Sequence, residues 1–481
     1  MELTALLFSL AALPLAMSET VLGVYIFSRH GDRTPKALAP ANLTSLGADE
    51  VYSSGNYYRS RYVDSNATSP IFGLSSDIAV AGQMTVTAPA DAVLQNSAQA
   101  FMSGLYPPVG ALSTQALAND SSVESPLGGY QYIPINTVST ASSSADSENS
   151  AWLQGNSGCG NAVVSSNNYF LSSEYTSTFD DTKSFYSDLL PVINSTFDAK
   201  QATFKNAYTI FDYVHVATIH NSTIPSSDLL TNETLTQLQL LANAHEWGLA
   251  YNSTDTIRAV AGSTLAAQIV QQLNSTLNSK SAQPFGIQFG AYASFLSFFG
   301  LAQLQNVSAE FTGIVDYAAA MTFELVTNAT VSGSEYPSPD DVSVRFLFAN
   351  GTAAQIEPRA YPLFGQSETL LPWNTFASEM GKFAIGTTAE WCQACGNTTG
   401  QCASSTSTDS GGGDAAASST SGKGNGISLP VAGVIGALVT LVVILGAEAA
   451  IYAISGLRLV KKSTLAQAGS GAGITTAGAK A

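Results

Sequence analysis

The sequence predicts an α/β domain, with a mainly parallel sheet and a helical cap, followed by one C-terminal transmembrane helix. Three observations carry this prediction. Residues 21–27 form an almost unbroken apolar run of β-branched and aromatic side chains, as in a strand buried on both faces. Residues 179–272 show several helical periodicities, which predict the cap. Residues 427–447 contain no charged side chain and are long enough to cross a bilayer.

The first segment of the chain predicts export. An apolar run covers residues 3–15, and the small side chains of residues 16–18 suit cleavage after Ser18. Glu2 stands where signal peptides usually carry a basic side chain. We expect residues 1–18 to be a signal peptide and residues 19–402 to form the exported domain.

The predicted first strand ends in a heptapeptide rich in cationic side chains, Arg29-His30-Gly31-Asp32-Arg33-Thr34-Pro35. Gly31 allows a sharp turn, and Pro35 has the backbone angle that begins a helix. Ligands of open α/β sheets bind at the carboxyl ends of the strands, where a helix N-terminus also attracts anions. An imidazole and two guanidinium groups at that position predict a phosphate site.

The pattern Arg-His-Gly-x-Arg-x-Pro resembles the motif of the histidine phosphatase superfamily, in its histidine acid phosphatase and phytase branch. Three further stretches are similar to that family: residues 43–62, as the helix after the catalytic turn, residues 97–107 and residues 361–365. The resemblance covers roughly residues 21–390. It implies a phosphoglycerate mutase-like core with a helical insertion.

The resemblance also implies a mechanism. His30 is the catalytic nucleophile that forms a phosphohistidine, and Arg29 and Arg33 bind the phosphate, while an aspartic acid protonates the leaving alcohol. Imidazole is a good nucleophile near neutral pH, and arginine forks match phosphate oxygens. This scheme needs no metal and no other cofactor, and its partner is a small phosphate ester.

Several positions depart from the family pattern. Counting back from Ser97 places Val93 where the family has a third arginine, and counting back from Gly300 places Gln288 and Phe289 where it has a His-Asp pair. No His or acidic residue lies between residues 280 and 305. A lost general acid costs about 10²–10⁴ in rate, so the pattern predicts a site that attracts phosphate but turns over slowly.

Other acids and histidines are candidates for the missing group. We expect Asp32 to cap the following helix, and the pair His245-Glu246 to be structural within a helix. His215 and His220 flank a short apolar stretch and are most simply hydrogen-bonded structural groups. An acid from any part of the chain that lies beside His30 would restore the mechanism.

Charge and sequons narrow the possible functions. The 481 residues carry a net charge of -17, and such a surface repels nucleic acid. Asn-x-Ser/Thr sequons, which predict surface glycosylation, are scattered along the exported domain. They occur at Asn42, Asn66, Asn119, Asn194, Asn221, Asn232, Asn252, Asn274, Asn306, Asn328, Asn350 and Asn397. Oligomeric state has no signal in the sequence.

Four cysteines, an even number, predict disulfide bonds in an oxidising compartment. Three pairings of Cys159, Cys392, Cys395 and Cys402 are open. We favour structural disulfides over a metal or redox site at residues 392–395, because no second pair has matching spacing. We expect one bond to join Cys159 to the C-terminal cluster.

The C-terminal end predicts a membrane anchor. Residues 403–426 are rich in Ser, Thr and Gly, like a flexible stalk, and lead into the span at residues 427–447. Basic residues follow at 458, 461 and 462, which predicts a cytoplasmic tail over residues 448–481. This topology places the large domain outside the cell or in the lumen of a vacuole or another endomembrane compartment.

The remaining pattern completes the expected element order. Residues 138–157 predict a long loop, residues 306–327 a helix and residues 342–348 a strand, which a hairpin turn at Asn350-Gly351 joins to residues 353–356. Three functions fit the whole sequence: a phosphomonoesterase, a noncatalytic surface glycoprotein that binds a phosphorylated ligand, and a structural glycoprotein that uses the fold as a scaffold.

Overall fold

The structure is a computed structural model that describes residues 19–138, 158–221, 224–333 and 335–403. The predicted signal peptide, nearly all of the predicted stalk, the predicted span and the predicted tail lie outside these ranges. Within the described ranges, no helix has the length and apolar character needed to cross a membrane.

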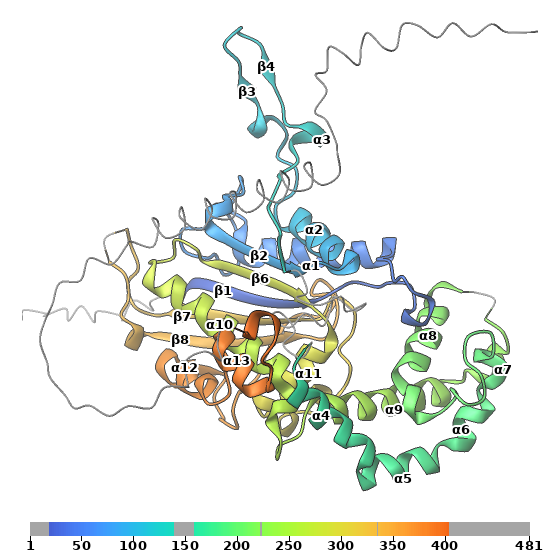
Figure 1. Cartoon of the computed structure of the whole chain (residues 1–481). Coiled ribbons are helices and arrows are strands. Elements are labelled where there is room, and N and C mark those ends of the chain that lie inside the picture. Colours follow the sequence, from blue (N-terminus) through green and yellow to red (C-terminus); the bar gives the residue numbers. More distant parts are fainter. Residues whose placement is uncertain (1–18, 139–157, 222–223, 334, 404–481) are drawn as a thin grey trace, which may run out of the picture. The chain divides into compact units, whose positions relative to one another are not determined.

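The centre of the fold is an eight-stranded sheet with the order β10-β8-β7-β1-β6-β2-β5, in which β9 pairs with β8 (Figure 1). The sheet is mixed rather than mainly parallel. Strands β1, β6, β2 and β5 run parallel, whereas β7, β8, β9 and β10 join by antiparallel pairing. The strands are β1 (Thr20–Arg29), β2 (Met84–Pro89), β5 (Asn136–Val138), β6 (Phe285–Gly290), β7 (Ala320–Thr327), β8 (Val342–Ala349), β9 (Arg359–Ala360) and β10 (Leu370–Pro372).

The helix predicted over residues 306–327 is wrong, because Ala320–Thr327 is strand β7. Residues 321–325 alternate apolar and polar side chains, which is a strand signal that the helix assignment overlooked, and every residue of β7 is buried between β1 and β8. The predicted strand at 342–348 is confirmed as β8. The segment after it turns at residues 353–356, and the antiparallel partner of β8 on that side is β9 instead.

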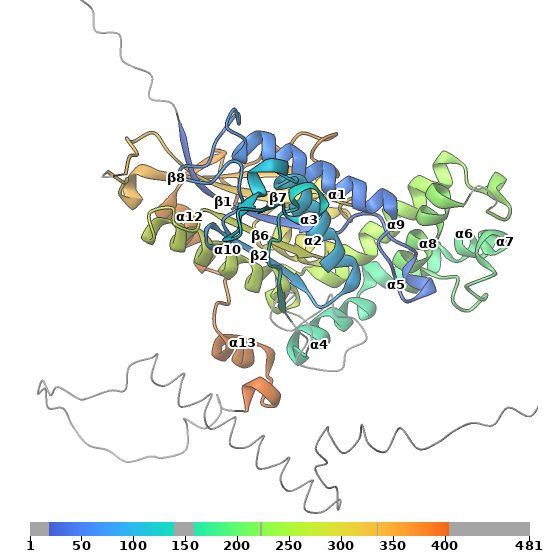
Figure 2. The ribbon, with the colours of Figure 1, turned by 90° about the horizontal axis from the view of Figure 1, so that it is seen from above.

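Helices cover both faces of the sheet (Figures 1 and 2). One face carries α1 (Ser45–Tyr58) and α2 (Ala92–Leu105), which pack on each other. The other carries α10 (Val260–Asn278), α11 (Tyr292–Leu301) and α12 (Trp373–Gly381). Each face has its own buried apolar cluster, as expected for a sheet between two helical layers.

The predicted helical cap is present between β5 and α10 and has a separate apolar core. In Figure 1 its green helices lie beyond the end of β1, which places them next to the motif. Its helices are α4 (Gly160–Asn168), α5 (Ser173–Asp181), α6 (Lys183–Asp188), α7 (Leu190–Ile193), α8 (Ala207–His220) and α9 (Asn232–Ala250). A thin arm that carries β3 (Gln115–Ala116), β4 (Ser122–Val123) and α3 (Pro126–Gly129) precedes β5.

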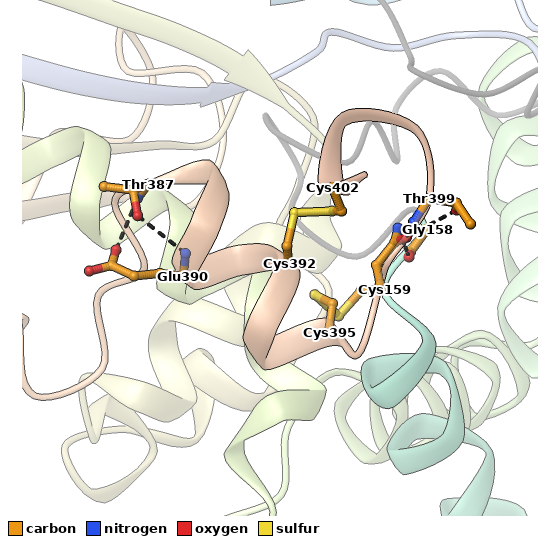
Figure 3. Close-up of a disulfide and its surroundings, with 9 residues drawn as sticks. Gly158, Cys159, Thr387, Glu390, Cys392, Cys395, Thr399 and Cys402 are labelled. Atoms are coloured by element: carbon orange, nitrogen blue, oxygen red, sulfur yellow. Dashed lines mark hydrogen bonds between the residues drawn. A yellow bond between two sulfur atoms is a disulfide. The ribbon is translucent and has the colours of Figure 1, made fainter. Parts of the chain in front are cut away.

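Two disulfides fasten the C-terminal end of the domain (Figure 3). Cys159, at the start of α4, is bonded to Cys395, and Cys392 is bonded to Cys402. The expected bond between Cys159 and the C-terminal cluster is confirmed. The cluster lies on and just after α13 (Thr388–Cys395), whose first turn is closed by a capping box. Such bonds are typical of an oxidising compartment.

Candidate functional site

The heptapeptide lies at the edge of the sheet where the parallel strands β1, β2 and β6 all end. Arg29 is the last residue of β1 and is in register with Gly290, the last residue of β6. His30 follows directly and is only 1% exposed. Its Nδ1 lies 2.8 Å from the carbonyl oxygen of Gly31, which can only accept a hydrogen bond. Nδ1 therefore carries the proton and Nε2 the lone pair, as a nucleophile requires.

Gly31 is needed for close packing. A Cβ at this position would lie 2.0 Å from the carbonyl oxygen of Gly47 in the first turn of α1. The absence of both side chains lets α1 begin directly against the motif. Pro35, by contrast, precedes only one 3₁₀ turn, Lys36–Leu38, and the α-helix starts at Ser45.

Asp32 does not cap the turn that follows the motif, because that turn has no side-chain cap. Its Oδ2 instead accepts hydrogen bonds from Thr44 Oγ1 and from His220 Nε2, both at 2.5 Å. Thr44 is the N-cap of α1, and His220 is the last residue of α8. Asp32 therefore hydrogen-bonds the motif both to the start of α1 in the core and to the end of α8 in the cap.

Arg29 is held between two aromatic rings. Its guanidinium carbon lies 4.5 Å from the ring centre of Tyr317 and 5.6 Å from that of Tyr292. Nη1 donates to the carbonyl oxygen of Val315. Nε is buried and has no hydrogen-bond partner among the described residues.

Arg33 is fully buried and paired with Asp212 of α8. Nη2 lies 2.8 Å from Oδ1 and Nη1 3.2 Å from Oδ2, and Nη2 also donates to the hydroxyl of Tyr208 at 3.1 Å. Nε again has no partner within the described ranges. The site thus contains two buried guanidinium N–H donors that no described side chain or carbonyl satisfies.

A small cavity lies against Arg29. It has a volume of about 20 Å³, close to the room that one water molecule needs. His215 of α8 and Asp316 of the loop before β7 both line it. Burial lowers the pKa of His215, so its imidazole is neutral at neutral pH. The ring of Tyr317 separates the two histidines, at 5.7 Å from His30 and 6.1 Å from His215.

The histidine phosphatase superfamily (branch 2) model matches residues 38–349 of the chain. The chain belongs to this family. A lysosomal acid phosphatase from Xenopus laevis is 26% identical over 321 residues, which span 63% of this chain and 65% of that relative.

Solved structures of the same fold include two bacterial phytases. The phytase from Citrobacter braakii superimposes with a TM-score of 0.50 at 15% identity, over 79% of this chain and 99% of the phytase. That of Klebsiella sp. ASR1 gives a TM-score of 0.50 at 11% identity, over 76% and 97%. The chain therefore has the fold of the phosphomonoesterases of histidine phosphatase branch 2.

Val93, the residue predicted to stand in place of the family's third arginine, lies on α2 close to a residue that contacts the motif. Ser97 Oγ accepts a hydrogen bond from the Gly31 amide at 3.3 Å, and Val93 lies one turn earlier on the same face of α2. Val93 is fully buried. An apolar side chain thus lies one turn before the α2 residue that contacts Gly31 of the motif.

Gln288 and Phe289 lie within β6, beside Phe27 and Ser28 of β1, so neither reaches the end of the strand. Gln288 Oε1 accepts a hydrogen bond from Tyr25, and Phe289 is part of the apolar core. The pairing of β1 with β6 ends at Arg29 and Gly290, so the residues that follow the end of β6, as His30 follows the end of β1, are Ala291 and Tyr292. Neither of these two residues is a histidine or an acid.

The pair His245-Glu246 lies away from His30 but is linked to its surroundings. His245 is buried among aromatic rings, and its Nδ1 lies 2.8 Å from Glu246 Oε1. Glu246 Oε2 accepts a hydrogen bond from the hydroxyl of Tyr292 at 2.7 Å. The pair supports the position of Tyr292, which agrees with the structural role expected for it.

Sequence reasoning missed four residues of the site: Asp212, Tyr292, Asp316 and Tyr317. Asp212 lies 179 positions from Arg33, and no local pattern connects them. One signal was available for Asp316, because it is the single charged residue in the apolar run 314–321. An isolated acid in such a run marks a point where the chain must reach solvent, because an unpaired carboxylate is costly to bury.

Proposed function

We propose that this chain is a slow phosphomonoesterase that transfers the phosphoryl group of a phosphate monoester to His30. One observation supports the proposal most directly: the Nε–H donors of Arg29 and Arg33 are buried and unpartnered among the described residues. A buried unsatisfied donor costs about 1–3 kcal/mol, more when charged, and an anion at this site would remove that cost. Phosphate is one of the two anions, with carboxylate, whose oxygens match the donors of a guanidinium group.

The proposed reaction has two steps. His30 Nε2 attacks phosphorus and displaces the alcohol, and water then hydrolyses the phosphohistidine and regenerates the imidazole. Arg29 and Arg33 stabilise the charge that spreads over the phosphoryl oxygens. The slow rate follows from Val93, which supplies no third guanidinium, and from Ala291 and Tyr292, which supply no acid at the end of β6.

The expected partner is a small phosphate ester, and no metal or organic cofactor enters the scheme. The net charge of -17 disfavours nucleic acid as a substrate. The two disulfides support a domain that folds in the secretory pathway. We infer a protein with its large domain extracellular or lumenal, anchored by the span predicted at residues 427–447.

The test is a phosphatase assay on the full-length chain in detergent, with p-nitrophenyl phosphate as substrate and a His30→Asn variant beside it. The proposal predicts weak hydrolysis by the native chain and none by the variant. Thermal unfolding shows whether the variant folds. Equal rates in two folded proteins would overturn the proposal.

A second candidate function is noncatalytic binding of a phosphorylated ligand. Two observations favour it: Asp212 already neutralises Arg33, and the cavity beside Arg29 has room for about one water molecule. Calorimetry with inorganic phosphate and inositol hexakisphosphate distinguishes the candidates. Binding that is lost in Arg29→Met, with no hydrolysis of either ester, supports the binder. If the chain neither binds nor hydrolyses these compounds, both candidates are excluded, and a structural glycoprotein that uses the fold as a scaffold is the function that stays.

A further inference from the structure

A phosphomonoesterase with His30 as its nucleophile needs a group that protonates the leaving alcohol. An alkoxide is a strong base, so its departure from phosphorus is slow unless an acid supplies a proton. The acid must also exchange its proton with water between turnovers. The described carboxylates around the motif are Asp32, Glu50, Asp212 and Asp316.

Two of these carboxylates are committed to other partners. Asp212 binds Arg33 with both oxygens, and its Oδ2 also accepts the backbone amide of Lys36 at 2.8 Å. Asp32 is fully buried, and its Oδ2 accepts from Thr44 and His220. Both oxygens of Asp212 are engaged. Asp32 Oδ1 has no partner among the described residues, but the side chain is fully excluded from the water with which an acid must exchange its proton.

Glu50 is a weaker candidate for a geometric reason. Its Oε2 accepts the backbone amide of Asp32 at 2.8 Å, so it faces the motif from the α1 side. It does not line the cavity beside Arg29. A proton on Glu50 would therefore support the motif loop and not the ligand.

Asp316 lies in the cavity itself, together with Arg29 and His215. Its backbone is fixed, because its amide donates to Asn350 Oδ1 at 2.8 Å. Its neighbours are tied to the motif: Val315 accepts from Arg29, and the Ala318 amide donates to the carbonyl oxygen of His30 at 2.9 Å.

The carboxylate of Asp316, by contrast, is solvent-exposed and forms no hydrogen bond or ion pair with any described residue. Asp316 therefore carries an acid without a hydrogen-bond partner among the described residues, on a segment whose neighbouring residues are hydrogen-bonded to both His30 and Arg29.

We propose that Asp316 is the general acid of this site, a role that the chain's own sequence motif does not contain. The inference rests on the proposed function. As His30 Nε2 forms a bond to phosphorus, the bond from phosphorus to the ester oxygen breaks, and Asp316 gives its proton to that oxygen. In the second step the Asp316 carboxylate takes a proton from water, whose oxygen attacks phosphorus and displaces His30.

The groups that face Asp316 are consistent with this role. Arg29 of β1 and His215 of α8 line the same cavity, and Glu50 of α1 and Asp212 of α8 lie within electrostatic range of that cavity. Exposure to solvent lets the attacking water reach the Asp316 carboxylate and return the proton in the second step.

The test compares two substrates that differ in their need for an acid, assayed with the full-length chain. Glycerol 2-phosphate releases a strongly basic alkoxide, whereas p-nitrophenyl phosphate releases a weakly basic phenolate. Asp316→Asn is expected to lower kcat/KM for glycerol 2-phosphate by about 10²–10⁴ and for p-nitrophenyl phosphate by less than about fivefold. Asp316→Glu is expected to recover part of the loss, and the exposed Asp180→Asn serves as a neutral control.

Each outcome is decisive. Equal losses on both substrates, or no loss on either, would overturn the role of Asp316. The selective loss appearing in Glu50→Gln instead would transfer the role to Glu50 and equally overturn the inference. A native chain that hydrolyses neither ester would refute the proposed function and the inference with it, whereas native activity with an unchanged Asp316→Asn would refute only the inference.

Discussion

Arg33 of the motif and Asp212 of helix α8 form a two-point ion pair in which both side chains are almost completely excluded from solvent. A second contact, His220 to Asp32, joins the same helix to the preceding motif residue. The helical insertion therefore holds the motif loop in place, and the loop's conformation depends on α8.

Removing the charge of Asp212 should destabilise the fold. Asp212→Asn leaves Arg33 buried without a counter-ion, and breaking such a pair costs about 3–5 kcal/mol of the free energy of unfolding. The matched control is Asp180→Asn, which removes an exposed pair with Lys183 worth less than about 1 kcal/mol. Urea unfolding of both variants measures the difference. An equal loss of unfolding free energy in the two variants would show that the buried pair stabilises the fold no more than the exposed pair does.

Restoring a cation on α2 should strengthen phosphate binding. Val93 lies on the same helix face as Ser97, which contacts the motif, so Val93→Arg directs a guanidinium toward His30. A charge-assisted hydrogen bond contributes about 1.5–3 kcal/mol, which corresponds to about 10- to 150-fold tighter binding of inorganic phosphate by calorimetry. Val93→Met controls for the added bulk. Unchanged affinity in a folded Val93→Arg variant would contradict this geometry.

The stability of the fold should fall as pH rises toward 7, in part because of Glu50. Burial raises the pKa of Glu50 to about 7, from an ordinary value of 4.5. Between these pH values the folded chain binds a proton that the unfolded chain has lost, so folding becomes less favourable with rising pH. The loss is on the order of 1–2 kcal/mol, because Glu50 is partly exposed and screened. In Glu50→Gln the free energy of unfolding, measured by urea unfolding at a series of pH values, should depend less on pH over this range. An unchanged pH dependence would exclude Glu50 as its source.

The two disulfides should contribute unequally to stability. Cys159–Cys395 closes a loop of 236 residues and Cys392–Cys402 a loop of 10. Loop-closure entropy then predicts losses of about 5 and about 3 kcal/mol when each pair is replaced by serine. Denaturant unfolding of the two double variants provides the comparison. A larger loss at the short loop would contradict the entropic account.

The sequence predicted the elements whose patterns are local. The buried run at 21–27 identified β1, residues 43–62 contain the predicted helix as α1, and the alternation at 342–348 identified β8. Strand β7 was mispredicted as part of a helix, although residues 321–325 alternate apolar and polar side chains as a strand does. Strand order depends on pairings between distant segments, which local patterns do not encode.

The site was predictable to a similar degree. The motif singled out His30, Arg29 and Arg33 as the candidate site, and the match to the histidine phosphatase superfamily (branch 2) confirms the family that the motif indicated. The partners of these residues come from α8 and from the loop before β7, far away in the chain. Chain folding alone brings Asp212 and Asp316 to the motif, so only the structure reveals them.

The central claim is that His30 accepts a phosphoryl group, and direct detection of that intermediate tests it. The full-length chain is mixed with a phosphate monoester, quenched in alkali, which preserves phosphohistidine, and digested for mass spectrometry. The account predicts phosphate on the peptide that contains His30, and none in His30→Asn. Hydrolysis of the ester with His30 unmodified at every time point would contradict it.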